Sequence, residues 1–124
     1  MTLTTLVAGQ DAQAREAAIA AAIASGGQAD DTALIFEGSP AVKTEFNPAV
    51  RLIRIAPGCP CCTGRLTMQV TLNRILRQPP ARLYIGLANA AHLDAFRDFL
   101  TRPPYASLLT MTEDIRLPDS PHAY

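Results

Sequence analysis

The three cysteines of this chain, Cys59, Cys61 and Cys62, lie within four residues of one another. Thiolates bind zinc, cobalt and copper(I) strongly, and the spacing i, i+2, i+3 allows one tight loop to bring three sulfurs together. Gly58 gives the backbone freedom before the loop, and Pro60 stiffens its middle. A closed zinc site has four ligands, so a metal held here needs one more donor from elsewhere.

The same residues permit two other interpretations. Cys59 and Cys62 form a Cys-x-x-Cys pattern just before a predicted helix, the placement that lowers thiol pKa values in oxidoreductases, so the chain could be a small thiol redox protein. In the second interpretation the loop has no chemical role, and the chain is a protein-interaction module with no site chemistry. A stabilising disulfide framework is not expected, because three is an odd number and the adjacent Cys61 and Cys62 would form a strained pair.

Strands and helices are predicted to alternate along the chain. Apolar runs bounded by Gly or Pro predict strands over residues 3–8, 33–36, 50–56, 82–87 and 107–111. Helices are predicted over 11–25, 66–77 and 90–100. The residues expected on the buried faces of the last two helices are Met68, Leu72, Ile75 and Leu76, and then Leu93, Phe96 and Leu100.

This alternation predicts an α/β fold of three layers, with a mostly parallel five-stranded sheet and helices on both faces. We expect a single α/β domain over residues 1–116. Residues 117–124 include Pro118 and Pro121 and are predicted to form a flexible C-terminal tail.

The loops that follow parallel strands meet along one edge of the sheet, where ligands bind. That edge is predicted to carry the cysteine loop, Glu37 and His92. Either Glu37 or His92 could therefore supply the fourth metal ligand. Glu37 could instead be a solvated loop carboxylate and His92 a solvent-facing residue, and the fourth ligand could equally be water or a group from another chain.

The overall charge limits the partners of this chain. Eleven basic and eleven acidic residues give a formal net charge of zero, which argues against binding to nucleic acid or to an anionic membrane. The N-terminus lacks the basic segment of a secretory signal, and the longest apolar tract, 17–24, is too short to span a membrane. We therefore expect a cytoplasmic protein with no membrane partner.

Residues 55–66, Ile-Ala-Pro-Gly-Cys-Pro-Cys-Cys-Thr-Gly-Arg-Leu, resemble the Cys-x-Cys-Cys segment of the CobW-like GTPases, P-loop NTPases related to the metallochaperones UreG and HypB. Residues 83–92 and 34–38 are similar to two further segments of that family. The resemblance implies a P-loop-NTPase-like (Rossmann-like) half domain. It also implies that Cys59, Cys61 and Cys62 bind zinc or another divalent transition metal, with a metalloprotein client as a possible partner. A homodimer is a further possibility, because a set of three ligands can be completed by sharing the metal across a two-fold axis.

The chain departs from that family where nucleotide would bind. Against the pattern Gly-x-x-x-x-Gly-Lys-(Ser/Thr), Gly9 matches the first glycine, but Ala14, Arg15 and Glu16 replace the last three positions. Glu16 places a negative charge where phosphate and magnesium would sit. Gly86 replaces an acid that would organise magnesium, and the chain ends before any Asn-Lys-x-Asp motif. We therefore expect a pseudo-GTPase that binds no nucleotide: a non-catalytic metal-binding protein.

Two groups of charged residues are expected to be exposed. Arg15 and Glu16 are predicted to be ordinary exposed helix residues, although they could be relics of a phosphate site, or Arg15 could attract a small anion. The second group is spaced for i, i+3 and i, i+4 pairing on a solvated helix face and comprises Asp94, Arg97, Asp98 and Arg102.

Overall fold

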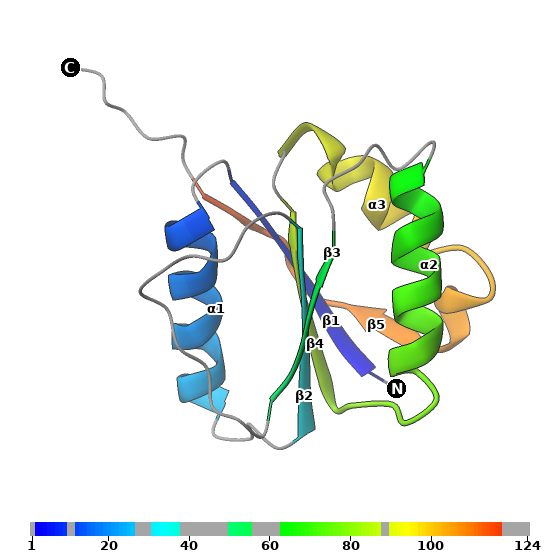
Figure 1. The fold of residues 1–124 in the computed structure, drawn as a ribbon, viewed down its shortest axis with the longest axis horizontal. Coiled ribbons are helices and arrows are strands. Elements are labelled where there is room, and N and C mark those ends of the chain that lie inside the picture. The colour runs from blue at the N-terminus through cyan, green and yellow to red at the C-terminus, as the bar shows by residue number, and fades with distance from the viewer. Residues whose placement is uncertain are drawn as a thin grey trace.

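The computed structural model describes residues 2–9, 12–26, 31–37, 50–55, 63–87 and 90–117. Within them, a central sheet is covered by α1 on one face and by α2 and α3 on the other (Figure 1). The helices are α1 (Ala12–Gly26), α2 (Thr63–Ile75) and α3 (Leu93–Leu100), with short 3₁₀ turns at Ala90–His92 and Tyr105–Ser107. The strands are β1 (Thr2–Ala8), β2 (Thr32–Glu37), β3 (Arg51–Ile55), β4 (Arg82–Leu87), β5 (Leu109–Met111) and β6 (Ile115–Arg116).

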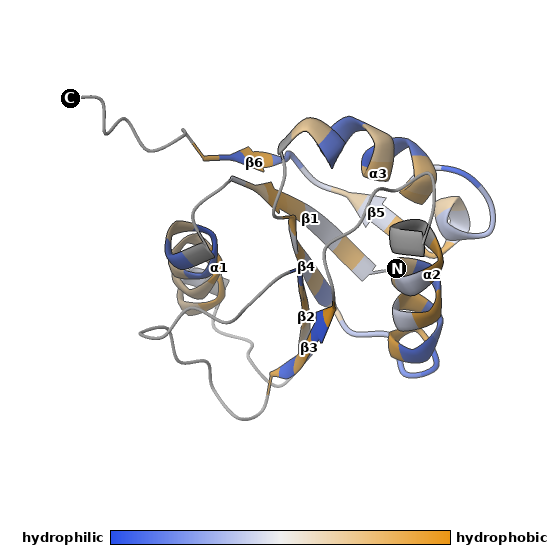
Figure 2. Ribbon diagram, turned by 45° about the horizontal axis from the view of Figure 1, so that its top comes forward, coloured by the Kyte–Doolittle hydropathy of each residue, from blue (hydrophilic) through white to orange (hydrophobic). Residues whose placement is uncertain are grey.

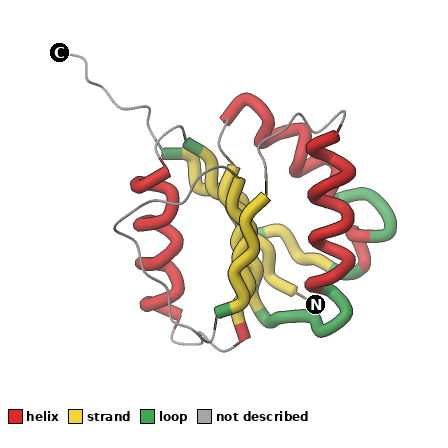
Figure 3. Tube along the Cα trace, viewed as in Figure 1, coloured by secondary structure: helices red, strands yellow, loops and turns green. Residues whose placement is uncertain are grey.

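The strands lie in the order β3-β2-β4-β1-β5, and each neighbouring pair is parallel. The short strand β6 also pairs with β1, at Val7 and Ala8, while β5 pairs with the start of β1. Parallel strands need crossover connections, and three of these contain a helix: α1 follows β1, α2 follows β3 and α3 follows β4, on the two sides of the sheet (Figure 3). The predicted α/β class, with a mostly parallel sheet and helices on both faces, is confirmed.

The core has one apolar layer on each side of the sheet. The strands are hydrophobic along most of their length, as expected for strands covered on both faces (Figure 2). The buried layer beneath α1 consists of Val7, Ile19, Leu34, Phe36, Val50 and Tyr84. The larger layer beneath α2 and α3 includes Leu6, Ile35, Met68, Leu72, Ile75, Leu83, Ile85, Leu93, Phe96, Leu100 and Tyr105. The predicted apolar faces of α2 and α3 are therefore confirmed, with Leu76 partly buried.

Several boundaries differ from the predicted ones, and one short strand was not predicted. Helix α2 begins at Thr63, three residues before the predicted start, so it directly follows the last cysteine in the sequence. Strand β5 begins at Leu109, because the residues before it form the 3₁₀ turn that buries Tyr105. The two-residue strand β6 was not predicted, because a segment of that length has no detectable periodicity.

The charged residues of α3 make longer-range contacts than predicted. Arg102 and Asp98 do pair at i, i+4, with 2.8 Å between Nη2 and Oδ2. Arg97, however, pairs with Asp114, and Asp94 lies 2.9 Å from the Arg116 guanidinium. These two ion pairs connect α3 to the segment around β6. The spacing of the charges therefore predicted the local pair of Asp98 and Arg102 but not these longer-range pairs.

The predicted tail lies outside the described residues except for Leu117. The backbone N–H of Leu117 donates to the carbonyl of Ala8 over 2.9 Å, and its side chain packs against the layer beneath α1. Among the described helices, none has the length and apolar character needed to cross a bilayer.

Candidate functional site

The carboxyl ends of four strands meet at one edge of the sheet. Parallel pairing aligns Glu37 of β2 with Ile55 of β3, and Ala8 of β1 with Leu87 of β4. This is the edge at which ligands bind in open α/β folds. The predicted gathering of strand ends is therefore present, and it gives a common frame for the candidate residues.

The cysteines themselves lie outside the described residues. Their flanking elements are described: β3 ends at Ile55 and α2 begins at Thr63, so the sequence between them contains Cys59, Cys61 and Cys62. Helix α2 therefore has the positive end of its dipole at the terminus that follows Cys62 in the sequence. The prediction of three thiolate ligands stays a prediction.

Glu37 is buried, with 2 % of its surface exposed. It is the last residue of β2, beside the last residue of the strand that precedes the cysteines. The interpretation of Glu37 as a solvated loop carboxylate is wrong, because the residue lies inside a strand that is flanked by β3 and β4. By alternation with Ile35, its side chain is directed to the face that α2 and α3 cover.

His92 is half-buried and occupies the N-cap position of α3, where its side chain makes no capping hydrogen bond. It follows β4, the strand beside β2, and so belongs to the same edge as Glu37. Within the described part of the chain, no three His, Cys, Asp or Glu side chains are grouped closely enough to hold a metal ion.

Arg15 and Glu16 are not exposed, which corrects the prediction for both. Their exposed fractions are 3 % and 2 %. The guanidinium of Arg15 donates through Nη1 to the carbonyl of Gly9, and its Nη2 lies 3.5 Å from the carbonyl of Glu37. Arg15 therefore reaches from the start of α1 to the ends of β1 and β2. Its burial is explained by these carbonyl acceptors, which position along a helix does not reveal.

Glu16 forms a two-bonded ion pair with Arg54 of β3. Its carboxylate oxygens lie 3.0 and 3.3 Å from the two terminal nitrogens of Arg54. The same guanidinium lies 5.2 Å from the centre of the Phe36 ring, within the range of a cation–π contact. Sequence reasoning missed Arg54, and the one available signal was a charged residue inside a predicted strand.

Gly86 lies on β4, and its neighbours leave no space for a side chain. A Cβ atom built on Gly86 would lie 2.7 Å from Cδ1 of Phe36, a distance that side-chain carbons do not tolerate. The ring of Phe36 is itself fully buried in the layer beneath α1. The glycine is thus explained by the close approach of this ring.

The residues at the three positions that were compared with the P-loop pattern each contact other parts of this chain. The cation at position 15 binds backbone carbonyls, the carboxylate at position 16 binds Arg54, and the ring of Phe36 covers Gly86. Arg15 and Glu16 connect the start of α1 to the carboxyl ends of β1, β2 and β3.

Part of the chain is similar to a curated protein. A 55-residue stretch, 44 % of this chain, is 46 % identical to the zinc chaperone YeiR of Escherichia coli (strain K12). That stretch covers 17 % of the length of YeiR. No protein-family model matches the chain. No solved structure matches it significantly.

Proposed function

We propose that this chain is a non-catalytic protein that binds zinc or a similar thiophilic ion through Cys59, Cys61 and Cys62. The observation that carries the proposal is the 46 % identity over 55 residues to a zinc chaperone. The cysteine spacing also supports it, because three thiolates in one short segment are a ligand set that zinc favours. The CobW-like resemblance implies the same metal-handling function.

Glu37 is the stronger of the two candidates for a fourth ligand. It ends the strand that pairs with β3, and β3 leads directly into the cysteine segment. A zinc ion that joined the cysteines to Glu37 would connect the loop to the rigid centre of the sheet. His92 lies further along the same edge, after β4, and is the second candidate.

We further propose that the ancestral nucleotide site is lost, which makes the chain a pseudo-GTPase. The contacts of Arg15 support this, because a guanidinium that binds two backbone carbonyls replaces a lysine that would bind phosphate. The carboxylate of Glu16 would repel phosphate, and position 86 has no room for a magnesium-organising acid. Restoring phosphate binding would therefore require changes at several independent positions.

The test is the metal content and zinc affinity of the reduced protein, measured by elemental analysis and chelator competition. The triple variant Cys59→Ser, Cys61→Ser, Cys62→Ser serves as the comparison, with thermal unfolding to establish that it folds. We expect one zinc per chain at sub-micromolar affinity in the natural protein, and loss of that zinc in the variant. Half an equivalent per chain would assign the site to a homodimer.

Absence of bound zinc, or an affinity that the triple variant retains, would overturn the metal-binding proposal. In a parallel titration with a fluorescent GTP analogue and magnesium, we expect no saturable binding. Saturable binding would overturn the proposed loss of the nucleotide site and leave the metal proposal intact. Glu37→Gln and His92→Asn identify the fourth ligand, because zinc affinity should fall in one of the two variants.

A further inference from the structure

Strand β3 is at the end of the strand order, and its outer side pairs with no strand among the described residues. Backbone N–H and C=O groups on such an edge can pair with another extended chain. Charged side chains often protect an edge, but those of β3 are directed elsewhere. Arg54 pairs with Glu16, and Arg51 donates to the carbonyl of Gln78 over 2.7 Å.

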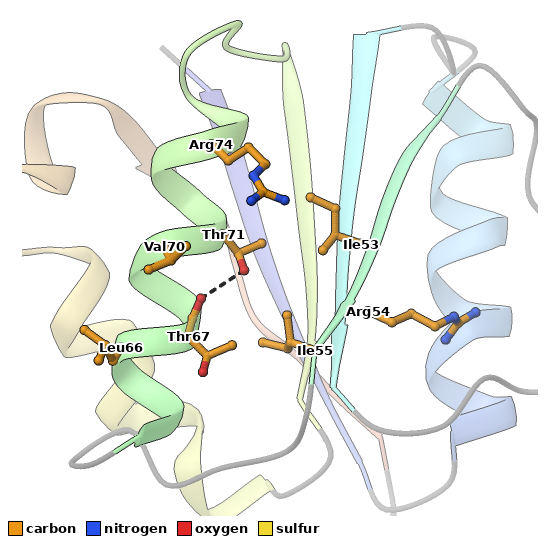
Figure 4. A pocket seen from close by; sticks show the side chains of 8 residues that line it. All are labelled: Ile53, Arg54, Ile55, Leu66, Thr67, Val70, Thr71 and Arg74. Atoms are coloured by element: carbon orange, nitrogen blue, oxygen red, sulfur yellow. Dashed lines mark hydrogen bonds between the residues drawn. The ribbon is translucent and has the colours of Figure 1, made fainter.

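A groove of about 430 Å³ lies between this edge and α2. Figure 4 shows Ile53 and Ile55 projecting from β3 toward α2, and Thr67 and Thr71 projecting back from the helix. The hydroxyl of Thr71 donates to the carbonyl of Thr67 over 2.9 Å, so it is satisfied within the helix. The floor of the groove is therefore largely apolar and has room for side chains from outside.

The rim of the groove is unusually apolar for an exposed helix surface. Leu66 and Val70 are 61 % and 55 % exposed, and they lie one turn apart on α2. Neighbouring residues at i and i+4 present one continuous surface. An apolar surface that borders an unpaired strand edge is the arrangement used when a domain binds an extended peptide as an additional strand.

The charge of the groove indicates the chemistry of its occupant. Arg74 extends from α2 toward Ile53 and makes no ion pair with any described residue (Figure 4). Among the described lining residues, Arg74 is the one whose charge is directed to the groove, because Figure 4 shows Arg54 extending to the other side of β3, where it pairs with Glu16. A second copy of this chain, docked symmetrically, would bring the same described lining residues, which include a second Arg74 and no carboxylate. An acidic segment of another protein would supply the carboxylate that Arg74 can pair with.

We propose that the groove between β3 and α2 binds an extended segment of a partner protein, which pairs with the outer edge of β3. The segment has apolar residues at alternate positions, facing Leu66 and Val70, and an acidic residue that pairs with Arg74. Such a partner would contact β3 and α2, the two elements that precede and follow the cysteine segment in the sequence. The proposal does not depend on metal binding, since its evidence comes from the groove and the strand edge.

The test is selection of a displayed library of random ten-residue peptides on the full chain. We expect enriched peptides with alternating apolar residues and a net negative charge. Their affinity should fall about tenfold with Arg74→Glu, where attraction becomes repulsion, and also with the double variant Leu66→Glu, Val70→Glu. The matched controls Arg77→Glu and Leu108→Glu alter exposed residues that do not line the groove and should leave the affinity unchanged.

Two further measurements identify where the peptide binds. Hydrogen exchange should slow at the amides of residues 51–55 when an enriched peptide is bound, and replacing its acidic residue by Lys should restore binding to Arg74→Glu. No enrichment, protection elsewhere, or equal binding to all variants would overturn the proposal. So would a dimer in sedimentation equilibrium that Leu66→Glu, Val70→Glu abolishes, because the occupant would then be a second copy. Zinc content is measured on the same variants and tests the proposed function separately. Failure of the groove proposal can therefore be distinguished from failure of the metal-binding proposal.

Discussion

Glu16 of α1 and Arg54 of β3 are held together by two parallel hydrogen bonds, 3.0 and 3.3 Å long, although Glu16 is almost completely buried. The pair joins the first helix to the edge strand. In this way the end of β3 that leads to the cysteine segment is fixed to the opposite layer of the molecule.

We predict that Arg54→Ala destabilises the protein by about 3 kcal/mol, because it leaves the buried carboxylate of Glu16 without its cation. Chemical denaturation measures the loss. The matched control is Arg102→Ala, which removes the exposed pair with Asp98 and should cost less than about 1 kcal/mol. Similar losses in the two variants would contradict the stabilising role assigned to the Glu16–Arg54 pair.

Arg15→Met tests the role of the buried guanidinium. The methionine side chain is of similar length but cannot donate to the carbonyls of Gly9 and Glu37. We therefore expect the free energy of unfolding to fall by about 2 kcal/mol. Arg77→Met, at an exposed position after α2, is the control and should change stability little. If both variants unfold at the same denaturant concentration as the natural protein, Arg15 does not stabilise the strand ends.

Gly86→Ala is predicted to destabilise the protein by about 1–3 kcal/mol, because the added methyl group would overlap the ring of Phe36. Phe36→Leu should recover much of this loss when it is combined with Gly86→Ala. A double-mutant cycle of unfolding free energies measures the coupling. Additive effects in that cycle would show that the two residues do not compete for the same space.

Tyr105 makes stability depend on pH in the alkaline range. Burial raises the pKa of its phenol above the ordinary value of about 10, and the hydroxyl donates to Oδ1 of Asn73 over 2.9 Å. The unfolded chain therefore loses this proton first as pH rises. The stability that the protonated Tyr105 phenol contributes is complete below the pKa of this group in the unfolded chain. It is lost as the pH rises toward and through the higher pKa of the group in the folded protein.

Unfolding of the natural protein and of Tyr105→Phe, followed between about pH 8 and 11, tests this. We expect the variant to be about 1 kcal/mol less stable near neutral pH, because the hydrogen bond is lost. The difference should shrink at the alkaline end. Parallel stability curves over the whole range would show that Tyr105 does not cause the alkaline loss.

The apolar faces of the helices could be predicted because their spacing alone determines which side is buried. Met68, Leu72 and Ile75 recur at helical intervals, and all three are buried against the sheet. Strands covered on both faces are similarly recognisable as continuous apolar runs, such as Ala33–Leu34–Ile35–Phe36 in β2.

The charged residues could not be placed in the same way, because their burial depends on partners distant in the sequence. Arg15 is buried because a carbonyl at the end of β2 lies within reach, and Glu16 because β3 carries Arg54. Asp94 matches the spacing for a local pair but contacts Arg116 instead. The candidate metal site was located from the sequence, and its three thiolates stay a prediction, since the cysteines lie outside the described residues.

The pairing of β1 has a consequence for how the chain acquires its structure during synthesis. Strand β1 is translated before the other strands of the sheet, yet its partners β4, β5 and β6 all follow α2 in the sequence. Strands β2 and β3 can pair with each other as soon as both have left the ribosome. Leu6 and Val7, which end up fully buried, stay exposed until β4 emerges. A nascent chain stalled before β4 should therefore be sensitive to proteolysis at β1 and should be a substrate for chaperones that bind apolar segments.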